Sequence, residues 1–283
     1  MMPTKTGVHC YIAFMPTTIQ DKTLTLGYLH SLGCKRFNNL FWRVPVHRLE
    51  DVLSYGELKD LIVLKRSRNI MRQTINCDGD NVELSSFVVI AYKLKTPTKK
   101  SRKIIQRALQ RAPYFKLCPS VYAFPQLRKP KPLEDKTKIQ HPDKKRRMTT
   151  PGEFFDLLNE FDCNILALPR MIVMNSSMYR ILIERMKTTR RVQCRKLIQT
   201  CRSISAMIRF QNEYTSSKAL KLRLSEVKYR YRAIRAVLSF LKKQMNIDMT
   251  KELVAVSKAI GSCLQTIRQA EEIRAVAVAR SVN

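Results

Sequence analysis

Four basic side chains on one predicted helix have the type and spacing needed to contact successive phosphates. Apolar residues recur along segment 99–112 at the spacing of a helix face that packs on a sheet. On the other side, intervals of three and four separate Lys100, Lys103, Arg107 and Arg111. At a rise of about 1.5 Å per residue, this row is roughly 16 Å long and meets about two or three phosphates. The row predicts electrostatic binding of a polyanion.

Two further groups of basic residues have more than one interpretation. On the predicted helix 217–246, a spacing of seven relates Lys221, Lys228, Arg235 and Lys242. They form either a solvated face, whose stems cover an apolar seam, or a ridge that follows phosphates. The second group lies in segment 126–150, which is rich in proline and charge. Its members are Lys144, Lys145, Arg146 and Arg147. This run is interpreted as a nuclear-import signal, a phosphate-contacting loop or a purely solvated loop.

The positive charge is concentrated in two blocks. The 283 residues include 53 Lys and Arg against 22 Asp and Glu, a formal net charge of +31. Residues 93–147 contain 18 basic and 3 acidic side chains, and residues 175–247 contain the same numbers. Such blocks are typical of surfaces that face a polyanion, with nucleic acid the first candidate and a membrane surface or ribosome next. Charge does not separate DNA from RNA, because phosphates dominate the affinity for both.

Catalytic and metal-binding motifs are missing from the sequence. With seven glycines in all, it contains no phosphate-binding Gly-rich loop, and neither G-x-S-x-G nor H-E-x-x-H occurs. The eight cysteines form no C-x-x-C pair and only four histidines are present. Buried thiols in a reducing compartment are therefore favoured over a zinc site. We predict no enzyme activity, no cofactor and no metal.

A weak internal repeat predicts the elements that position these residues. Tyr11–Phe14 recurs as Val89–Tyr92, and Phe41–Pro45 recurs as Val121–Pro125. Each copy predicts the order β-α-β-β-α-β, which makes a four-stranded antiparallel sheet with two helices on one face. The first copy spans strand 8–15, helix 21–32, hairpin 35–44, helix 47–55 and strand 60–64. The second spans strand 86–92, helix 99–112, hairpin 114–124, helix 152–161 and strand 164–168.

The C-terminal region predicts three helices, at about 176–212, 217–246 and 250–280. The middle helix has the sharpest pattern, because its apolar residues alternate steps of four and three, as in a coiled-coil seam. A turn at 246–248 favours an antiparallel hairpin with Asp248 or Thr250 as N-cap. Repulsion between basic flanks argues against a parallel self-dimer. The seam residues are Leu220, Leu224, Val227, Tyr231, Ile234, Leu238, Leu241 and Met245.

We therefore predict an α+β fold of two tandem ferredoxin-like βαββαβ modules followed by an α-helical region with an antiparallel coiled-coil hairpin. The predicted parts are module 1 at 1–85, module 2 at 86–174 with its basic loop at 126–150, and three basic helices at 175–283. No run of 18 or more apolar residues occurs, so no membrane span is expected. The N-terminus lacks a signal-peptide pattern, which predicts a cytoplasmic location, or a nuclear one in a eukaryote.

The two copies resemble a ferredoxin-like family that includes small CRISPR adaptation proteins. They are also similar to the middle domain of phenylacetate-degradation repressors and the N-terminal domain of chromate-resistance regulators. The resemblance covers about residues 7–170, and because such modules often pair as dimers, it implies an internal pseudo-dimer. Its carriers are Ile12–Phe14, Leu32–Gly33 and Phe41–Pro45 in the first copy, and Ile90–Tyr92 and Ser120–Pro125 in the second.

The sequence departs from this family where its nuclease members carry an aspartate. That residue ends the first strand and helps to hold a divalent ion, whereas the corresponding stretches here are Phe14-Met15-Pro16 and Tyr92-Lys93-Leu94. Hard cations prefer carboxylate oxygens, and neither stretch offers one. The resemblance therefore implies an inactive nuclease relative. RNA-recognition domains share the element order, but neither hairpin has their basic-Gly-aromatic pattern.

Together these patterns favour a non-catalytic nucleic-acid-binding protein, such as a DNA-binding regulator, that acts through module 2 and the C-terminal helices. The alternative is a protein-interaction scaffold, or a ribosome-associated RNA-binding protein, that works through the helices. An inactive relative of metal-dependent nucleases is the third class.

Overall fold

The computed structural model describes residues 9–14, 22–54, 61–68, 72–77, 80–126, 148–210 and 217–282. The chain forms two compact units. The first, called the sheet unit, comprises Met1–Gln140, Thr149–Met186 and Lys243–Asn246. The second, called the helical unit, comprises His141–Met148, Lys187–Lys242 and Ile247–Asn283.

The sheet unit contains two halves with the same order of elements. The first half consists of β1 (His9–Phe14), α1 (Lys22–Ser31), β2 (Lys35–Asn38), β3 (Phe41–Pro45), the short 3-10 helix η1 (Val46–Arg48), α2 (Leu49–Ser54) and β4 (Leu61–Arg66). The second half consists of β7 (Phe87–Leu94), α3 (Lys99–Gln110), β8 (Phe115–Cys118), β9 (Val121–Pro125), α4 (Pro151–Asn159) and β10 (Cys163–Val173). Between the halves lies a separate hairpin of β5 (Arg72–Cys77) and β6 (Asp80–Ser85), which the sequence patterns did not predict.

All strands of the two halves join in one antiparallel sheet of eight strands, in the order β2-β3-β1-β4-β10-β7-β9-β8. The α+β class is thus confirmed, and the four strands predicted for each copy join with those of the other copy in a single sheet. The reason is the length of β10, which continues past 168 and pairs Met171, Ile172 and Val173 with β4. A bulge interrupts β10 where Arg170 has a φ of 60°. The N–H of Arg170 donates to Gln126 Oε1 at 3.1 Å, which holds the bulge.

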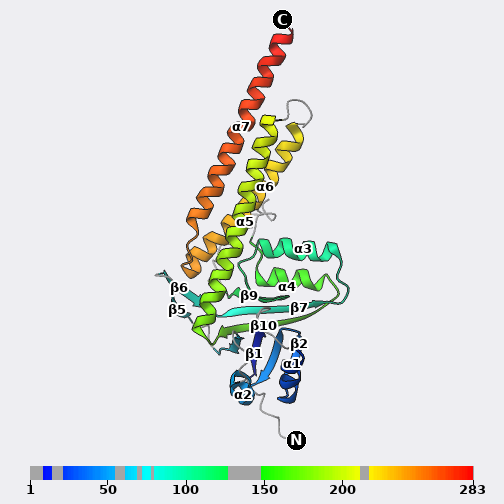
Figure 1. Cartoon of the computed structure of the whole chain (residues 1–283), viewed down its shortest axis with the longest axis vertical. Coiled ribbons are helices and arrows are strands. Elements are labelled where there is room, and N and C mark those ends of the chain that lie inside the picture. Colours follow the sequence, from blue (N-terminus) through cyan, green and yellow to red (C-terminus); the bar gives the residue numbers. More distant parts are fainter. Residues whose placement is uncertain are drawn as a thin grey trace, which may run out of the picture. The chain divides into compact units, whose positions relative to one another are not determined.

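Alternation along the strands places a hydrophobic core under each pair of helices. In the first half, Ile12, Trp42 and Val44 pack together with Leu29 of α1 and Val52 of α2. In the second half, α3 and α4 cover one face of the sheet (Figure 1). Their core is formed by Ile90, Tyr92, Ile105, Ala108, Leu109, Tyr122, Phe124, Phe154 and Leu158.

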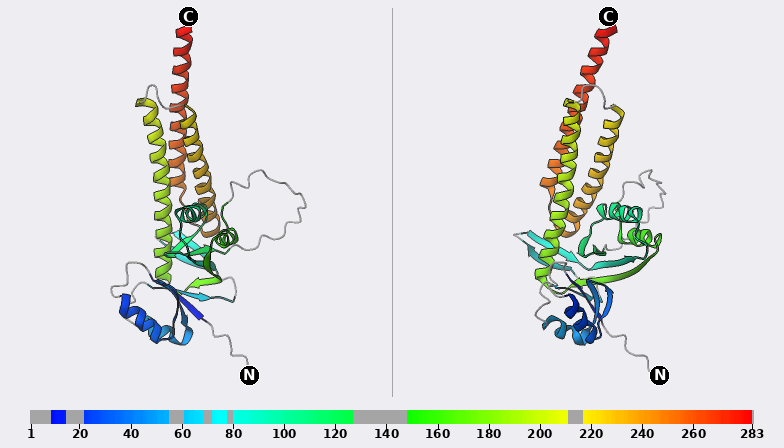
Figure 2. Two further views of the ribbon diagram at one scale, coloured as in Figure 1. Left: turned by 90° about the vertical axis from the view of Figure 1, so that its right-hand side faces the viewer. Right: turned by 45° about the vertical axis from the view of Figure 1, so that its right-hand side comes forward.

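The opposite face of the sheet is buried too, because the sheet folds back on itself and because Tyr179, in the helix that follows β10, packs on this face with its ring centroid 6.0 Å from that of Phe87. Residues of β1 contact residues of β8, although four strands lie between these two in the sheet order. At the same place, Asn38 Nδ2 donates to the Pro119 carbonyl at 3.5 Å and so connects the β2–β3 turn with the β8–β9 turn. Two views of this arrangement are given in Figure 2. Side chains from strands of both halves are buried on the opposite face, among them Phe41, Ile62, Leu64, Val89, Ala91 and Ala123.

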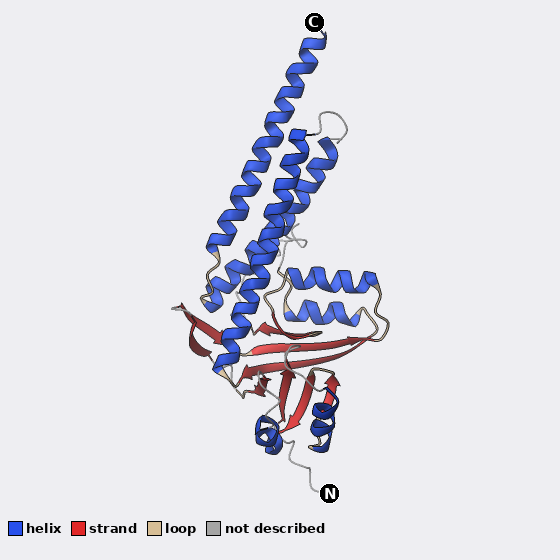
Figure 3. Cartoon of the chain, in the orientation of Figure 1, coloured by secondary structure: helices blue, strands red, loops and turns tan. Residues whose placement is uncertain are grey.

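The helical unit contains most of α5 (Ser176–Phe210) together with α6 (Ser217–Met245) and α7 (Thr250–Val282), the long helices of Figure 3. Each of the three helices buries a row of apolar side chains along one side. The predicted seam of α6 is buried except for Tyr231, which is half-buried. On the neighbouring helices the buried residues include Cys194, Leu197, Cys201 and Ile204 of α5 and Val256, Ile260, Cys263 and Ile267 of α7. No helix within the described ranges combines the length and apolarity that crossing a bilayer requires.

The turn between α6 and α7 depends on one carboxylate. Asp248 Oδ1 accepts from the N–H of Thr250 at 2.8 Å and from its hydroxyl at 2.5 Å, and Lys242 Nζ donates to Oδ2 at 2.9 Å. The hydroxyl of Thr250, followed by Lys242, lowers the pKa of Asp248 to about 2. A carboxyl with a lowered pKa in the folded state stabilises above its unfolded pKa of about 3.9, and this contribution disappears as the pH falls towards 2.

We therefore expect Asp248→Asn to lower the free energy of unfolding at pH 6, and the difference from the unmodified protein to shrink between pH 4 and pH 2. Urea unfolding followed by circular dichroism measures this. Glu272→Gln, which removes an exposed carboxylate from α7, is the control and should change stability little at either pH. A difference for Asp248→Asn that stays constant from pH 6 to pH 2 would contradict the ionic contribution.

Candidate nucleic-acid interface

Helix α3 begins with a capping box and a pair of lysines. Thr98 Oγ1 accepts from the N–H of Ser101 at 3.0 Å, and Ser101 Oγ accepts from the N–H of Thr98 at 3.1 Å. The first turn contains Lys99 and Lys100 and no acidic residue. Positive charge at a helix N-terminus opposes the helix dipole. The cap therefore secures the helix start, and helix stability does not explain the two lysines.

The outer side of α3 carries five exposed basic residues. Of the predicted row, Lys100, Lys103 and Arg107 are exposed. The fourth member, Arg111, is half-buried and caps the C-terminus of the helix. It follows the helix at the edge of the apolar face, three residues after buried Ala108 and directly before buried Ala112. We define the α3 basic face as Lys99, Lys100, Arg102, Lys103 and Arg107.

The charge of the α3 basic face is not neutralised by any other described residue. Within the described part of the chain, none of its five side chains forms an ion pair. Lys95, just before the helix, does pair with Asp162 at 2.7 Å, which raises the pKa of the lysine. The carboxylate of Glu153 accepts from the N–H of Thr150 and caps α4. Two acids of the second half are thus engaged away from the α3 basic face.

The row on α6 is different, because acids of its own unit neutralise part of it. Lys221 Nζ lies 2.8 Å from a carboxylate oxygen of Glu271, and Lys242 pairs with Asp248. Lys228 is half-buried, which leaves Arg235 as the exposed member with no ion pair among the described residues. The predicted run Lys144, Lys145, Arg146 and Arg147 lies outside the described residues. The α3 basic face is therefore the stronger candidate for phosphate contact.

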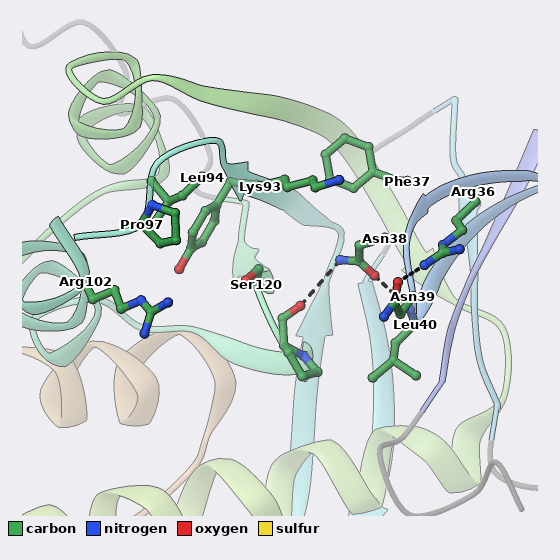
Figure 4. Close-up of a pocket in the computed structure, with 12 residues that line it drawn as sticks. Arg36, Phe37, Asn38, Asn39, Leu40, Lys93, Leu94, Pro97, Arg102 and Ser120 are labelled. Atoms are coloured by element: carbon green, nitrogen blue, oxygen red, sulfur yellow. Dashed lines mark hydrogen bonds between the residues drawn. The ribbon is translucent and has the colours of Figure 1, made fainter. Parts of the chain in front are cut away.

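A groove of about 900 Å³ lies beside the start of α3, where the two hairpin turns of the sheet unit meet. We call it the hairpin groove. Its lining includes Arg36 from β2, Lys93 from β7 and Arg102 from α3, and none of the described lining residues is a carboxylate. Figure 4 shows Arg102 pointing into the space and Lys93 extending toward Phe37. The sequence patterns missed this site, because its cations come from three separate segments.

Hydrogen bonds between and within the turns hold the groove in shape. Asn38 Oδ1 accepts from the N–H of Leu40 at 2.9 Å while its amide nitrogen bonds to Pro119. The N–H of Tyr92 donates to the carbonyl of Ser120 at 3.0 Å, and Ser120 has a φ of 62°. The side chain of Arg36 donates to Asn39 Oδ1. Asn38 is thus committed to structure, whereas the cations face the groove.

Among the described residues no cluster of three or more His, Cys, Asp or Glu side chains is placed to hold a metal ion. The ends of β1 and β7 hold buried Phe14 and exposed Lys93, and neither residue is a carboxylate. Burial also raises the pKa of Cys118 to about 12 and that of Cys194 and Cys201 to about 11. These thiols are protonated at neutral pH and are poor nucleophiles.

A comparison of the chain with protein-family models, with curated proteins and with solved structures found no match.

Proposed function

We propose that this chain is a non-catalytic nucleic-acid-binding protein whose principal contact is the α3 basic face. The observation that carries the proposal is the exposure of five basic side chains on one helix, without ion pairs among the described residues. Lysine and arginine that neutralise phosphates release condensed counterions, which supplies affinity without reading sequence. Contacts of this kind position a protein on the backbone, so discrimination among sequences should be modest.

The proposal includes two ferredoxin-like modules that pair within one chain. The matching strand orders β4-β1-β3-β2 and β10-β7-β9-β8 support it, as does the burial of the sheet face opposite helices α1 to α4. This arrangement fits an internal pseudo-dimer of the kind that the resemblance to small CRISPR adaptation proteins and to the two groups of regulators implies. The proposal contains no cleavage step, because Phe14 and Lys93 stand where a metal-holding carboxylate would be needed.

A second candidate is a scaffold that binds another protein through the helical unit. Large apolar side chains that are exposed on this unit favour it: Leu222 is 73% exposed and Ile273 is 71% exposed. A pull-down with and without nuclease treatment separates the two candidates. Partners that disappear after nuclease treatment support nucleic-acid binding, whereas partners that persist support the scaffold.

The test of the proposed function is the salt dependence of binding. If about six phosphates are neutralised, a plot of log affinity against log salt concentration should have a slope near −5. Fluorescence anisotropy of a labelled duplex, titrated with the protein at several salt concentrations, measures this slope. A slope shallower than about −2 would mean that most of the excess charge faces water, and would contradict the proposal.

A further inference from the structure

We propose that the hairpin groove binds unpaired nucleotides of a strand whose backbone continues along the α3 basic face. This inference rests on the proposed function and adds to it a preference for single-stranded ends or gaps over continuous duplex.

The size and the charge of the groove suit a phosphorylated ligand. Its volume of about 900 Å³ falls within the range of about 300–1,000 Å³ that ligand pockets occupy. Arg36, Lys93 and Arg102 supply positive charge from three elements, and no carboxylate among the lining residues opposes them. Arginine donors match the geometry of phosphate oxygens. The groove is also partly open to solvent, so that a strand can enter and leave it.

Two other groups in the groove suit a nucleobase. Phe37 is half-buried, and its ring is fixed by an edge contact with Phe41 at 6.4 Å between centroids. Aromatic rings of this kind stack on unpaired bases. The exposed side chain of Asn39 offers amide donors to a base edge, while its Oδ1 accepts from Arg36. Bases within a duplex are stacked and paired, and they cannot enter a concave site between two turns. The ligand that uses all of these groups is therefore unpaired.

The groove and the α3 basic face share one residue. Arg102 points into the groove (Figure 4). It is also one of the exposed basic residues of α3, next to exposed Lys103. From Arg102 to Arg107 the helix rises about 7.5 Å. A strand that leaves the groove at Arg102 therefore meets the remaining cations of α3 without a gap. This continuity favours a polymer over a free nucleotide, which would use the groove alone.

The experiment compares two labelled probes, a blunt 20-base-pair duplex and the same duplex with a single-stranded overhang of six thymidines. We expect the full-length protein to bind the overhang probe about tenfold more tightly, which is the size of effect that stacking of one base provides. Arg36→Glu combined with Lys93→Glu should abolish this preference, and it should lower the affinity for the blunt duplex no more than a control variant of equal charge does. The matched control reverses two exposed lysines outside the groove, Lys35→Glu and Lys116→Glu, and should keep the preference.

Tight binding of both probes without any preference overturns the groove inference and leaves the proposed function standing. Absence of binding to either probe overturns the proposed function and the inference together. If millimolar thymidine monophosphate by itself displaces the overhang probe, the groove binds a free nucleotide, and the inference that it binds a nucleic-acid strand is overturned. Trp42 fluorescence shows whether the double charge reversal folds. If it does not fold, the neutral pair Arg36→Gln and Lys93→Gln is used instead. A neutral pair that keeps the full preference for the overhang probe overturns the inference.

Discussion

Charge reversal of three residues on α3 is expected to weaken nucleic-acid binding by at least about a hundredfold at 0.1 M salt. The change is Lys100→Glu, Lys103→Glu and Arg107→Glu, which leaves the half-buried Arg111 and the groove residue Arg102 intact. Each phosphate contact that is lost means that nearly one counterion fewer is released on binding. The free-energy losses of the three contacts add, so their effects on the affinity multiply. The salt slope should also become shallower by about three. Reversal adds repulsion between carboxylate and phosphate.

The matched variant reverses three exposed residues of α6: Lys221→Glu, Arg235→Glu and Lys242→Glu. It should weaken binding less than about fivefold, because Glu271 and Asp248 already neutralise two of these lysines. Glutamate at positions 221 and 242 would be repelled by Glu271 and Asp248 and could destabilise the helices. Versions of both triple variants with glutamine in place of glutamate are therefore measured as well. Circular dichroism checks that all four variants fold. Equal losses for the two helices, or a larger loss for α6, would move the binding surface to the helical unit.

Truncation of Phe154 is expected to lower the free energy of unfolding by about 3–5 kcal/mol. This side chain of α4 is fully buried, and its ring centroid lies 5.3 Å from that of Phe124 and 6.3 Å from those of Tyr92 and Tyr122. Removing the ring leaves a cavity among three aromatic neighbours that cannot all collapse into it. Phe155→Ala is the matched control, because the next residue of the same helix is only half-buried and should cost about 1 kcal/mol.

The same variant tests whether the two halves unfold together. Trp42, the single tryptophan, is fully buried in the first half, so its fluorescence reports on that half alone. Because β4 pairs with β10 within one sheet, we expect Phe154→Ala to shift the urea midpoint of Trp42 fluorescence along with that of circular dichroism. An unchanged fluorescence midpoint beside a shifted dichroism midpoint would show that the halves are independent.

Local periodicity was enough to predict much of the fold and part of the candidate interface. The helix predicted at 99–112 is observed at Lys99–Gln110, and most of the apolar seam predicted on α6 is buried. Three residues of the predicted α3 row, Lys100, Lys103 and Arg107, are exposed as predicted. A helix repeats about every 3.6 residues and a strand every two, so which side chains share a face follows from sequence spacing alone.

Tertiary contacts decided the rest, since they join residues that no spacing relates. The extension of β10 past its bulge unites the halves in one sheet, and the pairing of Lys221 with Glu271 depends on how α7 lies against α6. The edge of a buried face is also set by what packs on it, which is why Arg111 is half-buried. The hairpin groove depends most on tertiary structure, because Arg36, Lys93 and Arg102 meet only where the sheet folds back and brings two turns together.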